Sequence, residues 1–198
     1  MRADARVNRD RILDAARAAF AARGLDVPMA AIARRAGVGV ATLYRRFPTR
    51  AALITAVFSD QLTHCLSVVD DALADPDPWR GFCSAIERVC AMQVTDRGFS
   101  AAFLTAFPGA VDFEHLRDRA EERFAEVVRR AKASGDLRAD FDRTDLALVL
   151  HANAGVTGDS PAAAMAASRR LVAYLLQAFR AGGGTPLPPP APLALRPG

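Results

Sequence analysis

The chain has 198 residues, of which 51% are hydrophobic and 24% are charged, and its net charge is +4 at pH 7. This length can bury one large core or two small ones, and the abundance of Ala and Leu favours an all-α protein. No apolar run approaches the ~20 residues that span a bilayer. The first residues also lack the apolar core of a signal peptide, so we expect a cytoplasmic protein with no membrane partner.

Charge is distributed unevenly along the chain. Residues 1–50 contain eleven Arg and four Asp, a net charge of +7, so the remaining residues together carry −3. Solvated charges scattered over helix surfaces would not segregate in this way. A basic N-terminal part on a mildly acidic body indicates that the N-terminal part binds a polyanion.

The chain begins with a polar stretch that the sequence predicts to be a flexible basic terminus, over residues 1–8. We favour a frayed end there over an arm that contacts DNA. The first helix is expected over 9–23, with Ile12 and Phe20 on its inward face and Gly24 at its end.

The next segment, over about 28–47, has the pattern of a helix-turn-helix. Two short stretches with apolar spacing, 30–36 and 41–47, are separated by a turn that contains Gly37 and Gly39. In the second stretch Leu43 and Phe47 are spaced i, i+4 and should face inward. The opposite side carries hydroxyl and guanidinium groups, as a helix that enters a DNA major groove requires.

A family resemblance rests on these residues. The run from Arg11 to Leu53, with ILDAARAAFAARG, IARRAGV, TLYRRF and PTRAAL, resembles the DNA-binding domain of the TetR family of bacterial transcriptional regulators. The match is free of gaps and covers about the first quarter of the chain. It implies a three-helix DNA-binding head over 9–50 and a helical body over 51–180, in about nine helices altogether.

The resemblance also implies which residues contact double-stranded DNA. Thr42 and Tyr44 match the family motif directly, whereas Arg46 and Arg50 stand where the family often has His and Lys. Val40 and Ala41 depart from the usual Lys and Gly, so any base contact there would be apolar, and Arg45 could supply a polar contact or be a solvated surface charge. The predicted DNA-binding residues are Val40, Ala41, Thr42, Tyr44, Arg45, Arg46 and Arg50.

Beyond the head, apolar periodicity predicts helices over 50–74, 79–95, 98–107, 113–134, 143–156 and 161–180. The helix over 50–74 would belong to the head at its start and to the body farther on, so it should link the two. Thr49 is its expected N-cap. Residues 181–198 are rich in Gly and Pro and are expected to be a disordered tail.

The family body binds a small-molecule effector, and this implies a pocket enclosed by the helices from 79 to 156. The candidate ligand-binding residues are Trp79, Phe82, Ile86, Cys90, Gln93, Phe99, Phe103, Phe107, His115 and Asn153. Core packing is the alternative for the apolar members, and a satisfied buried polar group is the alternative for the others. An aromatic lining favours an unidentified effector that is hydrophobic and flat.

Family members pair as twofold dimers, and the last two predicted helices carry the apolar stripes for such an interface. The candidate interface residues are Leu146, Val149, Leu150, Met165, Val172, Leu175, Leu176 and Phe179. Such stripes can also be intramolecular core. We expect a homodimeric repressor that leaves a palindromic operator when a hydrophobic ligand binds. The alternative is an architectural DNA-binding protein without an effector.

Catalytic and metal-binding patterns are absent from the sequence. The cysteines are Cys65, Cys83 and Cys90, and the histidines are His64, His115 and His151. The cysteines form no CxxC pair, and we expect buried thiols, with a redox role as the lesser alternative. The histidines form no HExxH, and there is no GxSxG or phosphate-binding glycine loop. We therefore expect no enzyme activity, no cofactor and no metal.

Overall fold

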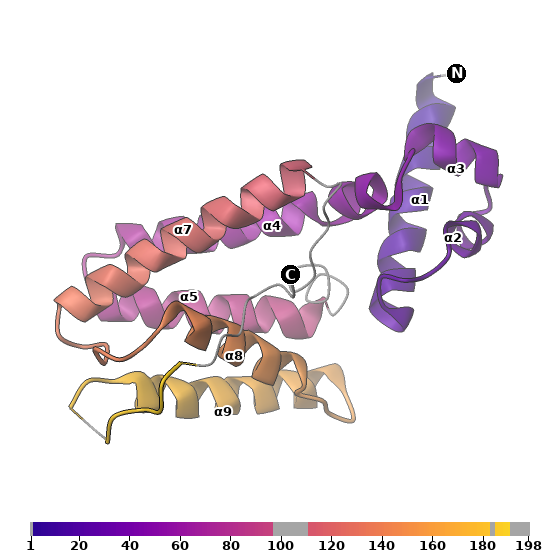
Figure 1. Ribbon diagram of the computed structural model, residues 1–198. Coiled ribbons are helices and arrows are strands. Elements are labelled where there is room, and N and C mark those ends of the chain that lie inside the picture. The colour runs from indigo at the N-terminus through magenta and orange to yellow at the C-terminus, as the bar shows by residue number, and fades with distance from the viewer. Residues whose placement is uncertain (1, 97–110, 183–184, 191–198) are drawn as a thin grey trace.

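The computed structural model describes residues 2–96, 111–182 and 185–190. Within these ranges the chain forms eight α-helices and no strand apart from one isolated bridge between Leu137 and Arg180. A small three-helix head lies at one end and a larger helical body at the other (Figure 1). The predicted all-α class is confirmed. The helix expected over 98–107 lies outside the described residues.

The head consists of α1 (Arg2–Arg23), α2 (Met29–Ala36) and α3 (Val40–Arg46). Its core contains side chains from all three helices and from the start of the next one: Ile12, Ala16, Phe20, Ile32, Ala33, Leu43 and Leu53. The first helix starts at Arg2 and not at residue 9 as predicted. Residues 2–8 contain no Pro or Gly that would stop a helix, and the apolar stripe used for the prediction begins only at Ile12.

A tight turn joins α2 to α3. Gly37 ends α2 in the left-handed conformation, with φ at +65°. Its N–H donates to the Arg34 carbonyl at 3.1 Å, and the Val38 N–H donates to the Ala33 carbonyl at 3.0 Å. This pairing closes the end of a helix, and glycine adopts the required φ without steric cost. The turn therefore fixes the direction in which α3 leaves α2.

The long helix α4 (Arg50–Ala74) links head and body. Thr49 caps it as predicted, because its side chain accepts a hydrogen bond of 3.0 Å from the Ala52 N–H. By length and composition alone α4 could cross a membrane, but half of its apolar window is buried inside the fold. This burial is typical of a core helix in a helical bundle.

The body is arranged around α5 (Pro78–Thr95), which contacts α4, α7 (Val111–Ala133), α8 (Arg143–Ala154) and α9 (Pro161–Phe179). In Figure 1, α5 runs between α4 and α7 on one side and α8 and α9 on the other. Phe82 lies at the centre, with the rings of Phe124, Phe141 and Phe179 at 6.0, 5.4 and 6.5 Å. These tilted and edge-on contacts give the body its apolar core.

The segment after α9 lies across the loop between α7 and α8. The Ala181 N–H donates to the Asp136 carbonyl at 2.7 Å. Arg138 donates to the Thr185 carbonyl at 3.1 Å, and the Leu187 N–H donates to Asp140 at 3.0 Å. These bonds hold the start of the Gly/Pro-rich tail, while its predicted disorder stays a prediction.

Candidate functional site

The recognition helix α3 is anchored on one side and open on the other. Leu43 is fully buried and Phe47, which follows α3, is nearly so, while Val40 and Tyr44 are 42% and 46% exposed. Ala41, Arg45 and Arg46 are also exposed, and Thr42 is half-buried. Leu43 and Phe47 hold the helix to the head, so its other side is free to enter a groove.

A cation–π contact from α1 strengthens this anchor. The guanidinium of Arg9 lies over the Phe47 ring, 5.9 Å from its centroid. The Phe47 N–H donates to the Leu43 carbonyl at 2.8 Å. The end of α3 is thus fixed from two directions, which limits how far the exposed face can rotate.

Arg50 differs from the other predicted DNA contacts because its guanidinium already makes a hydrogen bond within the chain. It is half-buried, and its Nη1 donates to the Leu25 carbonyl at 2.5 Å, which ties the start of α4 to the loop before α2. A guanidinium has five N–H donors, so one bond leaves others available to a phosphate. Its predicted role in phosphate binding stays a prediction.

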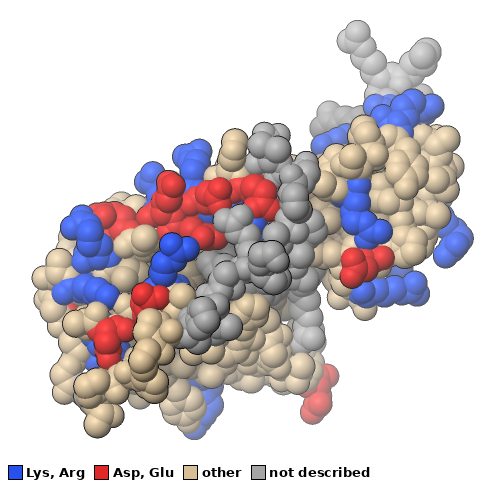
Figure 2. Space-filling model, in the orientation of Figure 1, with Lys and Arg blue, Asp and Glu red and all other residues tan. Residues whose placement is uncertain are grey.

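Three further arginines of the head were missed by the sequence reasoning. Arg11, Arg34 and Arg35 are all exposed. Arg11 lies against the α2–α3 turn, since a Cβ placed on Gly37 would be 2.6 Å from its Nη2. Figure 2 shows basic side chains, all of them arginines, at several places on the head. The sequence feature that could have indicated Arg34 and Arg35 is the polar side of the stretch 30–36, where these two adjacent arginines precede the turn.

In the body, several predicted ligand residues belong to the core. Phe82, Ile86 and Cys90 are at most 1% exposed, and the Trp79 ring is stacked 5.6 Å from Phe82. Aromatic and aliphatic side chains at helical spacing fill the space between α5 and its neighbours. Within the chain, the contacts of these side chains are therefore those of core packing, which was the alternative to a ligand-binding role.

Gln93 and Asn153 form a buried polar network instead of facing an open cavity. The Asn153 Nδ2 donates to the Cys90 carbonyl and to the Gln93 Oε1, both at 3.0 Å. Ser168 donates to the Asn153 Oδ1 at 2.6 Å. The network joins α5, α8 and α9 at a point where all three side chains are at most 4% exposed. Its bonds satisfy groups that would otherwise destabilise the core.

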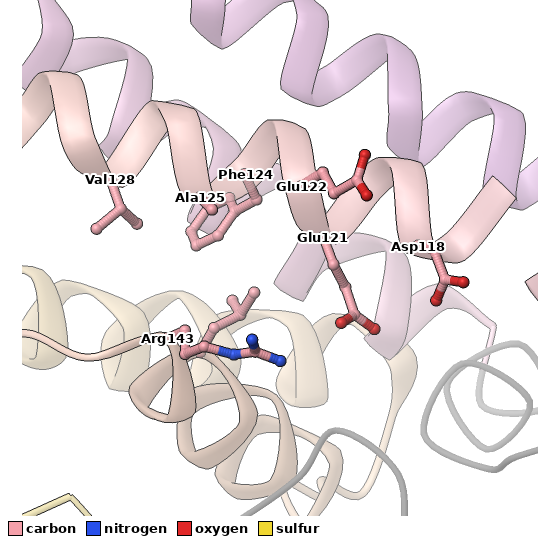
Figure 3. A pocket seen from close by; sticks show the side chains of 8 residues that line it. Asp118, Glu121, Glu122, Phe124, Ala125, Val128 and Arg143 are labelled. Carbon is pink, nitrogen blue, oxygen red and sulfur yellow. The ribbon is translucent and has the colours of Figure 1, made fainter. Parts of the chain in front are cut away.

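A cavity of about 340 Å³ opens between α7 and α8. Its lining consists of Asp118, Glu121, Glu122, Phe124, Ala125, Val128, Arg143 and Leu146. Figure 3 shows Asp118 and Glu121 extending from α7 toward the space below it, with the guanidinium of Arg143 entering from α8. None of the described ligand-binding candidates from the sequence lies among these eight residues. His115 is exposed on α7, and Phe99, Phe103 and Phe107 lie outside the described residues.

A smaller crevice of about 30 Å³ adjoins this cavity. The two share Glu121, Phe124 and Leu146, and the crevice continues among apolar side chains of α4, α5 and α8: Cys65, Val69, Ala85, Ile86, Val89 and Leu150. Of the predicted ligand residues, Ile86 alone lines it within the described chain. The cavity therefore has an acidic mouth and an apolar inner end.

The cysteines are poor candidates for redox chemistry. Burial raises the pKa of Cys65 and of Cys90 to about 12, and it raises the pKa of Cys83 to about 11. A thiol reacts through its thiolate, so these groups are inert near neutral pH. In the described ranges no group of three potential metal-ligating side chains comes together.

The predicted dimer residues divide into two sets. Val149, Leu150, Val172, Leu176 and Phe179 are buried within the single chain, and Leu146, Met165 and Leu175 are half-buried. A side chain buried in its own core offers little area to a partner. The contacts of the buried set are therefore those of an intramolecular core, which was the alternative to a dimer interface. The exposed side of α8 and α9 instead carries Leu148 and Tyr174, each 55% exposed.

Comparison with known proteins identifies relatives of this chain. Residues 12–57 match the family model described as bacterial regulatory proteins, tetR family. A TetR transcriptional regulator from Streptomyces coelicolor is 28% identical, covers 88% of this chain and 99% of its own, and has a TM-score of 0.55. A TetR transcription regulatory protein from Mycobacterium vanbaalenii is 32% identical over 90% of this chain and 98% of its own, with a TM-score of 0.48.

A more distant likeness concerns the fold alone. The transcriptional regulator FadR from Bacillus subtilis, solved in complex with stearoyl-CoA, is 15% identical, covers 84% of this chain and 97% of its own, and has a TM-score of 0.62. No curated protein sequence matches the chain.

Proposed function

Because this chain belongs to the TetR family of bacterial regulatory proteins, we propose that it is a homodimeric repressor that a small hydrophobic ligand releases from a palindromic operator. The observation that carries the proposal is the free face of α3. Leu43 and Phe47 anchor the helix, and Thr42, Tyr44 and Arg45 stay accessible beside a basic head. Repression is favoured over activation because steric occlusion of a promoter requires no contact with polymerase.

The body supports effector control over a purely architectural role. An architectural protein would be expected to have a filled core, whereas here a cavity of about 340 Å³ opens between α7 and α8. This volume lies in the range of small-molecule sites. FadR of Bacillus subtilis, which shares the fold, holds stearoyl-CoA, so a body of this architecture has room for a ligand.

For the dimer we propose the exposed side of α8 and α9. Leu148 and Tyr174 project from it, and Arg170 lies over the Tyr174 ring at 5.2 Å. A twofold pair that reads a palindromic operator must present its two recognition helices roughly 34–36 Å apart, as one turn of DNA requires. The double variant Leu148→Asp/Tyr174→Asp should sediment as a folded monomer. A variant that remains dimeric would exclude this face.

The test of DNA reading is selection of bound duplexes from a random library, repeated across salt concentrations. With three or four phosphate contacts per head, the slope of log K against log salt should be roughly −5 to −7. Arg45→Ala should weaken operator binding, whereas Arg119→Ala, which removes an exposed charge on α7, should leave it unchanged. Binding that is blind to sequence, or equal effects of the two variants, would refute the proposal.

A further inference from the structure

We propose that each half of the operator contains a thymine whose methyl group contacts Ala41 and a guanine that accepts hydrogen bonds from Arg45. This inference rests on the proposed function and names the base edges that the recognition helix reads. The observation behind it is the arrangement of side chains around α3, which distinguishes two residues that face a groove floor from the residues on either side of them.

The burial of Leu43 defines which side of α3 points away from the head. Leu43 is fully buried. At 3.6 residues per turn, the residues two positions before and after it, Ala41 and Arg45, both lie about 160° around the helix from it, and both are exposed. In Figure 1, α3 lies on the side of the head that is farther from the body. Ala41 and Arg45 therefore point toward the floor of a major groove that α3 enters.

The residues on either side of this pair carry hydroxyl groups. Thr42 and Tyr44 each lie about 100° from Leu43, in opposite directions around the helix. Tyr44 is 46% exposed and Thr42 is half-buried. Side chains on the flanks of a helix in the major groove face the sugar–phosphate walls, where hydroxyl groups donate to phosphate oxygens. Such contacts position the helix without reading sequence, which leaves the reading of bases to Ala41 and Arg45.

The side chain of Ala41 favours thymine. It has no group that forms hydrogen bonds, and the neighbouring Val40, which is 42% exposed, extends the apolar surface. Against the edge of adenine, guanine or cytosine, a methyl group displaces water from donors and acceptors and returns no hydrogen bond, which is unfavourable. Thymine presents a methyl group of its own in the major groove, so an apolar contact is favourable there.

The side chain of Arg45 favours guanine. A guanidinium has only donors, and guanine presents two acceptors, O6 and N7, whereas adenine and cytosine each present a donor in the major groove. Arg45 is exposed and makes no hydrogen bond or ion pair with the described chain, unlike Arg50, which is bonded to the Leu25 carbonyl. Four residues of helix rise about 6 Å and base pairs are about 3.4 Å apart, so the guanine should lie roughly two base pairs from the thymine.

Two small changes in the DNA test these contacts on the full-length chain. Uracil in place of thymine removes the methyl group, and 7-deazaguanine in place of guanine removes the N7 acceptor. Each thymine and guanine of the selected operator is replaced in turn, and binding is measured by fluorescence anisotropy at one salt concentration. We expect uracil to weaken binding about fourfold at one thymine of each half-site, as the loss of one apolar methyl contact predicts. We expect 7-deazaguanine to weaken binding about fivefold or more at the guanine roughly two base pairs away.

Variants of the chain assign each effect to a side chain. Arg45→Ala should abolish the effect of 7-deazaguanine and keep that of uracil, whereas Ala41→Gly should abolish most of the uracil effect and keep that of 7-deazaguanine. The effect that each variant keeps shows that its head is still folded and bound in the groove. Arg119→Ala, at an exposed position on α7, is the control and should keep both effects.

The outcomes separate the base contacts from the proposed function. If the chain selects no DNA sequence, both proposals are lost. If it selects a palindromic operator, the proposed function is supported, and the base contacts are then overturned when uracil is neutral at every thymine or when the 7-deazaguanine effect persists in Arg45→Ala. Effects that disappear with Ala41→Gly and with Arg45→Ala, each for its own base, support the contacts.

Discussion

The buried network around Asn153 allows a quantitative prediction of stability. Asn153→Ala removes two donated hydrogen bonds and one accepted bond, and leaves the Cys90 carbonyl, the Gln93 Oε1 and the Ser168 hydroxyl without that partner. At about 1 kcal/mol for each bond, the free energy of unfolding should fall by about 3 kcal/mol. For a chain of this size the melting temperature should fall by about 6–12 °C.

The experiment also includes a variant with a smaller expected loss of stability and a control variant. Ser168→Ala removes only the bond to the Asn153 Oδ1 and should cost about 1 kcal/mol. In the double variant the two effects should overlap by about 1 kcal/mol, because each single variant already breaks the shared bond. Gln177→Ala, at an exposed position on α9, should stay within about 0.5 kcal/mol of the parent.

Chemical denaturation with a fluorescence or circular dichroism readout measures the four variants and the parent on one scale. If Asn153→Ala costs no more than Ser168→Ala, or if the two changes add without overlap, the network does not hold α5, α8 and α9 together in the way the geometry indicates.

Three further predictions concern the turn, the thiols and the tail. Gly37→Ala should destabilise the head by about 1 kcal/mol, because φ is +65°, and should weaken operator binding, because the new Cβ pushes the flexible Arg11 side chain away from the turn. Gly24→Ala, at φ +75° with open surroundings, should cost about as much in a denaturation assay and leave operator binding unchanged. The folded chain should react slowly with iodoacetamide at pH 8, with half-buried Cys83 first, and rapid alkylation of Cys65 would contradict the raised pKa values. Hydrogen bonds from Arg138 and from the Leu187 N–H lower the pKa of Asp140 in the folded chain. The ionised carboxylate therefore stabilises the fold above the unfolded pKa of about 3.9, and this stabilisation is lost as the pH falls through the folded pKa. Asp140→Asn should flatten the decline in melting temperature below about pH 4.

The head was predictable from sequence because its function and its packing use different residue types. Leu43 and Phe47 had to face inward by their spacing, and this left hydroxyls and guanidinium groups outside, as the structure shows. Arg34 and Arg35 were missed because the reasoning concentrated on the second helix of the motif, although their exposure on α2 makes them part of the same basic surface.

The body was less predictable because ligand walls, dimer faces and cores all use apolar side chains at helical spacing. Phe82 fits the pattern of a ligand wall as well as that of a core, and its burial and its ring contacts with Phe124, Phe141 and Phe179 place it in the core. The residues that distinguish the observed cavity are charged. Asp118 and Glu121 look like ordinary solvated positions on an amphipathic helix until α8 is placed opposite them.

The position of α4 gives a physical route from the cavity to the head. Arg17 of α1 donates to the Val57 carbonyl of α4 at 3.1 Å, so the head is bonded to the side of this helix as well as joined to its end. Farther along, Gln61 contacts Asp96 at the end of α5 at 3.4 Å, and Val69 lines the inner crevice. A ligand group larger than about one methyl does not fit a crevice of about 30 Å³ unless one of its walls is displaced. We infer that the head follows when the displaced wall is α4, because Arg17 bonds the head to the side of this helix, whereas the walls on α5 and α8 are held together by the Asn153 network.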